Sequence, residues 1–91
     1  MKRIKVSVTA KDIALGFPTE SGACPIALAV GRCTGLRLVN AYQARIYGCR
    51  DVTDFKEQVV GFKPPRSAVR FMNDYDDGRP VKPFSFFLVE P

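Results

Sequence analysis

A run of thirteen residues near the end of the chain, 76–88, constrains the fold most; it reads Asp-Asp-Gly-Arg-Pro-Val-Lys-Pro-Phe-Ser-Phe-Phe-Leu. Its glycine and prolines end a helix and impose a turn. The residues that follow, Phe84 to Val89, predict a strand with apolar side chains on both faces. A strand of that kind belongs in a protein core, so the run predicts a compact α+β domain whose last element is buried.

Hydrophobic periodicity predicts the remaining elements. Residues 3–9 alternate between apolar and polar side chains, which is typical of a half-buried strand with a charged outer face. Residues 24–33 predict a largely buried helix, because Pro25 suits its first position and Gly35 suits the left-handed position after its end. The other predictions are a helical turn over 11–15, a loop over 16–22, one alternating strand over 36–47, a strand over 55–62, and a helix from 64–65 to Gly78.

The order of these elements is strand, helix, two strands, helix and strand. It predicts the α+β class: a single domain over residues 1–91, with a mostly antiparallel sheet of about four strands and two helices. The same order occurs in ferredoxin-like folds, where both helices cover one face of the sheet. The final strand counts against that arrangement, because it would be an exposed edge there although its residues are apolar on both faces. A different α+β sheet order is the alternative.

Few residues in the chain could carry catalysis, and the sequence predicts no enzyme. There is no histidine, which removes the commonest general base. Asp74, Asp76 and Asp77 could together hold a magnesium ion, but beside Gly78 they are better interpreted as a solvated turn at a helix end. The glycines follow neither phosphate-binding spacing. We therefore predict no cofactor and no metal site.

Cysteine usage and hydropathy favour a cytoplasmic protein. Cys24, Cys33 and Cys49 form an odd number at no metal-ligand spacing, as expected of small apolar residues in a reducing compartment. The basic start of the chain resembles that of a signal peptide, but the residues behind it alternate. No apolar run approaches the ~18 residues that span a bilayer, so no membrane association is expected.

A basic strand surface is the strongest candidate binding site, and the net charge of +5 favours acidic partners. Odd-numbered residues of the predicted strand over 36–47 share one face, and the next strand could add Lys56 and Gln58. The partner-binding residues predicted on this basis are Arg37, Gln43, Arg45, Tyr47 and Lys56. Such a face could bind an acidic protein, or the phosphates and a stacked base of a nucleic acid. The alternative is a charged face that only maintains solubility.

Two motifs resemble those of a group of small proteins encoded by bacteriophages and prophages. They are Cys-Pro-Ile-Ala-Leu-Ala at 24–29, preceded by Ile-Ala-Leu-Gly at 13–16, and the ending Asp-Gly-Arg-Pro-Val-Lys-Pro-Phe-Ser-Phe at 77–86. The resemblance spans most of the chain in order. It implies a phage origin, a compact fold and, for a phage protein, the host cytoplasm. It implies no activity, so no functional residue is transferred.

These observations favour a small non-enzymatic phage-type accessory protein that binds and modulates a host or phage macromolecule, with a protein partner favoured. The alternative hypothesis is single-stranded nucleic-acid or nucleotide binding through the basic sheet face. Small residues in the helix over 24–33, Ala27, Ala29 and Gly31, would also allow a second copy of the chain to approach closely, so a homodimer is a further partner to consider.

Overall fold

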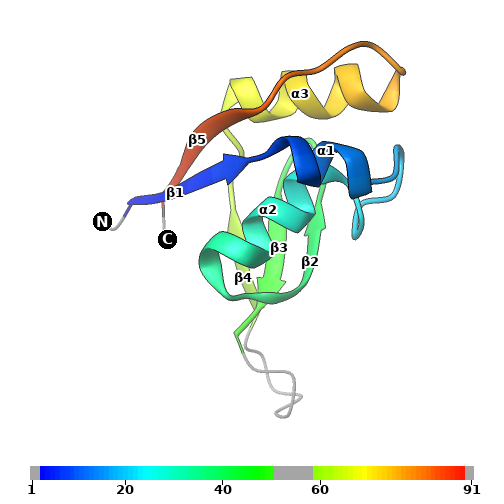
Figure 1. The fold of residues 1–91 in the computed structure, drawn as a ribbon. Coiled ribbons are helices and arrows are strands. Elements are labelled where there is room, and N and C mark those ends of the chain that lie inside the picture. Colours follow the sequence, from blue (N-terminus) through cyan, green and yellow to red (C-terminus); the bar gives the residue numbers. More distant parts are fainter. Residues whose placement is uncertain (1–2, 51–58, 90–91) are drawn as a thin grey trace.

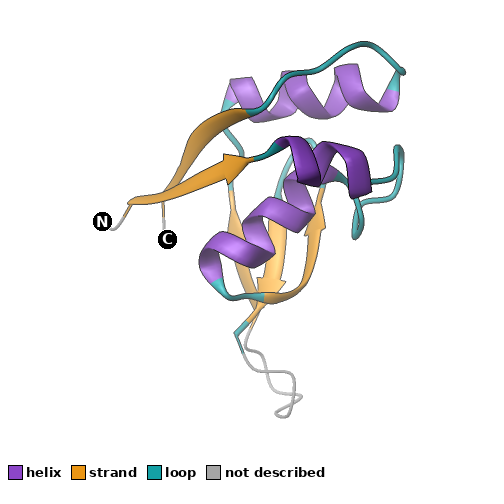
Figure 2. Cartoon of the chain, in the orientation of Figure 1, coloured by secondary structure: helices purple, strands orange, loops and turns teal. Residues whose placement is uncertain are grey.

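The structure is a computed structural model that describes residues 3–50 and 59–89. Three helices and five strands lie in this part of the chain, which confirms the predicted α+β class (Figures 1 and 2). Their bounds are β1 Arg3–Val8, α1 Ala10–Leu15, α2 Pro25–Thr34, β2 Arg37–Ala41, β3 Ile46–Cys49, β4 Val59–Phe62, α3 Arg66–Asp76 and β5 Phe84–Val89.

The described strands form two antiparallel sheets. The expected single sheet of about four strands is therefore wrong, and so is the ferredoxin-like strand order. β1 pairs with β5, from Arg3 opposite Val89 to Val8 opposite Phe84, and the second sheet has the order β2-β3-β4. The first and last strands pair because their inner residues complete one apolar surface. Val6 lies opposite Phe86, and both are buried.

The final strand is buried on one face only, although both faces are apolar. Phe86 and Leu88 are buried, whereas Phe87 and Val89 on the other face are about half exposed. The guanidinium of Arg3 lies 4.3 Å from the centre of the Phe87 ring, which partly shields that ring from water. The prediction of a core strand is therefore correct for its inner face.

Helix α2 lies between the two sheets and packs against β1 and β2 (Figure 1). Its ends match the sequence prediction: Pro25 is the first residue, and Gly35 follows the helix with a left-handed φ of 76°. Around α2, the core consists of Val6, Val8, Cys24, Ile26, Ala27, Ala29, Val30, Val39, Ala41, Ile46, Val60, Phe62, Ala68, Phe71, Met72, Phe86 and Leu88.

The predicted strand over 36–47 is wrong in one respect, because it is two strands joined by a turn. β2 ends at Ala41 and β3 begins at Ile46; between them the N–H of Tyr42 donates to the carbonyl of Arg45 at 2.9 Å. β2 also contains a bulge, since Arg37 pairs with Cys49 but Asn40, three residues on, pairs with Tyr47. The strand therefore carries one extra residue at this point.

Helix α1 is capped at its start by Thr9 and is held at its end by a side chain of α3. Thr9 caps α1 by accepting the N–H of Asp12, while the Asp12 carboxylate accepts the N–H of Thr9. This reciprocal pair satisfies backbone donors that a helix start would otherwise leave without a partner. The hydroxyl of Tyr75 in α3 donates toward the carbonyls of Gly16 at 2.7 Å and Ile13 at 3.2 Å, so α3 holds the end of α1.

Candidate functional site

One face of the β2-β3-β4 sheet carries exposed aromatic, apolar and basic side chains. In β3, Ile46 and Gly48 are buried toward α2, so Tyr47 and Cys49 point to the opposite side. The register places Tyr47 opposite Gly61, and Cys49 opposite both Val59 and Arg37. We call the surface formed by Arg37, Tyr47, Cys49, Val59 and Gly61 the outer sheet face.

Arg37 and Tyr47 share this face, as the sequence interpretation expected, but for a different reason. An uninterrupted strand would keep all odd residues on one side, whereas the odd residues Val39 and Ala41 are buried. The bulge after Arg37 reverses the alternation, and the turn before Ile46 reverses it again. The two reversals cancel, so Arg37 and Tyr47 lie on the same side of the sheet.

The other predicted residues lie elsewhere. Gln43 is in the turn, and its side-chain N–H donates to Oδ1 of Asn73 in α3 at 3.2 Å, so its expected place on the strand face is wrong. Arg45 is exposed at the end of the turn, immediately before β3. Lys56 lies outside the described residues.

The outer sheet face combines an aromatic centre with cationic ends. Tyr47 is 41% exposed, and its ring covers Gly61 so closely that a β-carbon there would lie 3.2 Å from it. Val59 beside it is 61% exposed. Arg37 lies toward one end of the sheet, and Arg45 and Lys63 flank the paired residues Ile46 and Phe62 at the other.

Sequence reasoning missed three contributors to this surface. Tyr42, an even-numbered residue, was not among the predicted residues, yet it is 47% exposed and its ring meets that of Tyr47 edge-on at 6.3 Å between centroids. Val59 and Lys63 were read only as parts of a strand and its end. Alternation within 59–62 could have identified Val59 as exposed, because Val60 and Phe62 are the buried pair.

A separate cavity of about 190 Å³ lies where α2, α3 and the β2–β3 turn meet. Its walls are loop residues 19–21, the first turn of α2, residues 41–43 at the end of β2 and in the turn after it, and the last turns of α3. Its lining consists of Thr19, Glu20, Ser21, Cys24, Pro25, Ile26, Ala41, Tyr42, Gln43, Phe71, Met72, Tyr75 and Asp76. The sequence predicted a loop over 16–22, and residues 19–21 of this loop form part of a concave site.

Cys24 is the buried thiol of this cavity. Its Sγ accepts the N–H of Ala27 at 3.5 Å and thereby caps α2. Burial raises the pKa of Cys24, Asp76 adds to the rise, and the bonds from backbone N–H groups oppose it only in part. Desolvation likewise raises the pKa of Tyr75, with smaller contributions from Cys24 and Asp76. A thiol whose pKa is raised stays protonated at neutral pH, which makes it a poor nucleophile.

The aspartates at the end of α3 have separate structural contacts. Asp74 lies 3.5 Å from Arg79, measured from Oδ1 to Nη1, and Oδ1 of Asp76 accepts the N–H of Thr19 at 2.8 Å. Within residues 3–50 and 59–89, no group of three or more cysteine, aspartate or glutamate side chains is placed to hold a metal ion. In the same part of the chain, no helix has the length and apolar character needed to cross a bilayer.

Comparison with known proteins adds no assignment: no family model matches the chain, and neither the curated proteins nor the solved structures contain a match.

Proposed function

We propose that this protein is a small non-enzymatic accessory protein of phage type, which binds a host or phage protein through its outer sheet face and modulates that partner. The observation that carries the proposal is the composition of the face. Tyr47 and Val59 are exposed at its centre, and Arg37, Arg45 and Lys63 lie toward its ends. Tyrosine and arginine are enriched among the residues that dominate binding energy at protein interfaces. The phage type rests on the resemblance of the motifs at 24–29 and 77–86.

The arrangement favours an acidic protein over a single-stranded nucleic acid. The rings of Tyr42 and Tyr47 are inclined at 64°, so they do not offer parallel platforms for successive bases. Val59 adds exposed apolar surface that a protein interface would bury. Cationic ends around an apolar centre suit a partner whose contact surface is acidic at its margin and apolar in the middle.

An exposed leucine beside the face supports an interaction role. Leu38 is 70% exposed and lies on the edge strand β2, with a left-handed φ of 53°. This backbone region is costly for a side chain with a β-carbon, and the exposed side chain gains little burial in return. The cost is accounted for if Leu38 is buried against a partner.

Charge reversal tests the proposal. The variant Arg37→Glu/Arg45→Glu is compared with Arg70→Glu/Lys82→Glu, which changes the net charge equally but in α3 and the connection before β5. We expect the wild type and the α3 variant to capture the same protein from a bacterial lysate, and the outer-face variant to lose it. Equal capture by both variants would contradict the proposed surface. Circular dichroism establishes that each variant is folded.

A second measurement distinguishes protein binding from the nucleic-acid alternative. Fluorescence anisotropy of a labelled single-stranded oligonucleotide is recorded at low and high salt. Under the proposed function, no binding is expected at low salt. Binding that weakens steeply with salt and is lost in Arg37→Glu/Arg45→Glu would instead favour the nucleic-acid alternative, because released counterions make such affinity strongly salt-dependent.

A further inference from the structure

The cavity between α2, α3 and the β2–β3 turn has room for one ring. Its volume is about 190 Å³, whereas a protein cavity of about 150 Å³ lined by apolar side chains accommodates benzene. Ile26, Phe71 and Met72 line it and are buried, so its inner part is apolar. A ring placed there would remove apolar surface from water on both sides of the contact.

The charged part of the lining is acidic. Glu20 and Asp76 contribute carboxylates, and among the described residues no lysine or arginine lines the cavity. The charge of the lining is therefore opposite in sign to the net charge of the chain, which is +5. Carboxylates beside a concave apolar site attract a cationic group and repel an anionic one.

Hydrogen bonds within the protein hold the walls of the cavity together. Asp76 accepts the N–H of Thr19, which ties the loop over 16–22 to α3. Gln43 donates to Asn73, which ties the turn to the same helix. The hydroxyl of Ser21 donates to Oδ1 of Asn40 at 3.0 Å and fixes the loop to β2. A site whose walls are already joined needs little ordering when a ligand enters.

We infer that this cavity binds a small organic cation made of one apolar ring and a short ammonium arm, the chemical class of the arylalkylamines. The ring occupies the space beside Ile26, Phe71 and Met72, and the ammonium group lies against Glu20 and Asp76. Tyr42 lines the cavity and also contacts Tyr47 of the outer sheet face. The carboxylates and apolar side chains that carry the inference lie outside that face, so the inference stands independently of the proposed function.

A titration followed by amide chemical shifts tests the inference with 2-phenylethylamine as the probe. We expect the shifts to concentrate at residues 19–26, 41–43 and 71–76. Phenylacetate has the same ring and the opposite charge, and we expect it to bind at least about tenfold more weakly, because the carboxylates repel it. No shifts with the amine, or equal affinity for both probes, would overturn the inference.

Two variants identify the carboxylates as the source of the selectivity. Glu20→Gln/Asp76→Asn keeps the shape of the side chains and leaves an oxygen at position 76 to accept the N–H of Thr19. Its affinity for 2-phenylethylamine should fall about tenfold. Asp77→Asn removes an exposed carboxylate outside the lining and should leave the affinity unchanged. Unchanged affinity in the double variant would overturn the assignment of the ammonium group to these carboxylates.

The buried thiol supplies a readout that does not depend on chemical shifts. In a Cys33→Ser/Cys49→Ser background, Cys24 is the one remaining cysteine. Saturating 2-phenylethylamine should slow its alkylation by iodoacetamide several-fold, because Cys24 lines the cavity. Alkylation at the same rate with and without the amine would show that the cavity is not occupied.

Discussion

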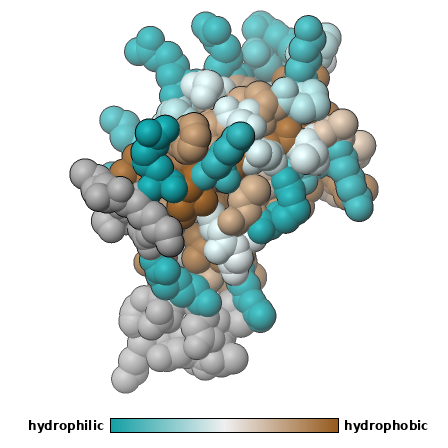
Figure 3. All heavy atoms as spheres, turned by 60° about the vertical axis from the view of Figure 1, so that its left-hand side comes forward, coloured by the Kyte–Doolittle hydropathy of each residue, from teal (hydrophilic) through white to brown (hydrophobic). Residues whose placement is uncertain are grey.

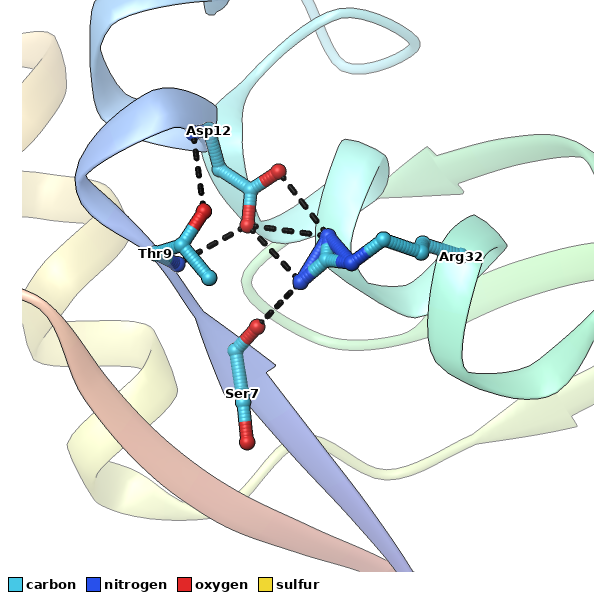
Figure 4. Close-up of polar contacts among 4 residues, drawn as sticks. All are labelled: Ser7, Thr9, Asp12 and Arg32. Carbon is cyan, nitrogen blue, oxygen red and sulfur yellow. Dashed lines mark hydrogen bonds and ion pairs between the residues drawn. The ribbon is translucent and has the colours of Figure 1, made fainter.

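Arg32 holds the buried carboxylate of Asp12 with both terminal nitrogens of its guanidinium. Nη1 lies 3.0 Å from Oδ1 and 3.1 Å from Oδ2, and Nη2 lies 3.1 Å from Oδ2 (Figure 4). Nη2 also donates to the carbonyl of Ser7 at 2.6 Å. One side chain of α2 therefore joins the start of α1 to β1, and the same carboxylate completes the cap on Thr9.

Removing this guanidinium should destabilise the domain. We expect Arg32→Ala to lower the free energy of unfolding by about 2 kcal/mol, because the buried carboxylate of Asp12 loses its cationic partner. Arg32→Lys should recover only part of the loss, since a single ammonium cannot donate as a planar fork. Urea denaturation measures both. Lys82→Ala removes an exposed charge as a control, and an equal small effect of the two alanine variants would show that the Asp12 contact contributes nothing measurable.

Two glycines should respond in opposite directions to alanine. At Gly48 a β-carbon would lie 2.9 Å from Cβ of Leu36 and 3.3 Å from Cγ2 of Val39, so these neighbours on the inner face of the sheet must shift. Gly48→Ala should therefore cost about 1–3 kcal/mol. At Gly31, within α2, the nearest atoms are 3.6 Å away, so Gly31→Ala should raise stability by up to about 1 kcal/mol through helix propensity. Thermal unfolding of both variants checks the signs, and a stabilised Gly48→Ala variant would contradict the packing described for this sheet.

The thiol of Cys24 should make stability fall at alkaline pH. Its pKa is raised above the ordinary value of 9.0, chiefly by burial. Below that value the thiol is protonated in both the folded and unfolded states. As the pH rises above it, the unfolded thiol ionises first, so the free energy of unfolding falls until the folded thiol also ionises. Cys24→Ser keeps a side chain that can cap α2 and does not ionise in this range.

Urea denaturation of wild type and Cys24→Ser at neutral pH, and again well above pH 9.0, isolates this effect. The wild type should lose more stability than the variant between the two conditions. Groups that do not interact with Cys24 titrate equally in both proteins and cancel in the comparison, whereas the part of the raised Tyr75 pKa that comes from Cys24 is lost together with the thiol. Identical losses would show that Cys24 does not contribute to the pH dependence.

Leu38 offers a test of backbone strain. Replacing it with glycine, which adopts a left-handed φ without steric cost, should raise the free energy of unfolding by about 1 kcal/mol. The exposed side chain contributes little burial that would be lost. Leu15→Gly, at an exposed position in α1 with an ordinary helical backbone, should instead destabilise. Destabilisation of similar size at both positions would indicate that the left-handed backbone of Leu38, in the β2 bulge, carries no strain that glycine relieves.

The outer sheet face is one location of exposed apolar side chains, and others are scattered over the rest of the described surface. Figure 3, which brings forward the side that carries the chain termini, shows apolar patches separated by hydrophilic side chains. Phe87 and Val89 belong to the exposed apolar set, but the guanidinium of Arg3 lies over the Phe87 ring. An intramolecular contact thus already shields part of the β1–β5 ribbon, whereas Val59 and Leu38 remain 61% and 70% exposed.

Local signals in the sequence by themselves determined the helices, their ends, and the first and last strands, β1 and β5. Pro25 begins α2 and Gly35 follows it, as their positions predicted, because a helix end depends on residues within about one turn. β1 and β5 also lie where the alternation over 3–9 and the apolar run over 84–89 placed them. Period-two patterning is a property of consecutive residues, so it can be read without knowing what a strand contacts.

Only the tertiary structure decided which strands pair, where the strand over 36–47 breaks, and how the cavity is assembled. β1 and β5 come from opposite ends of the chain, and their pairing becomes favourable only when Val6, Phe86 and α2 share one core. Glu20 and Asp76 were interpreted separately, as part of a loop and as a helix end, yet they line the same cavity. The physical reason is that contacts between distant segments depend on which apolar faces meet after folding, and no residue's immediate neighbours carry that information.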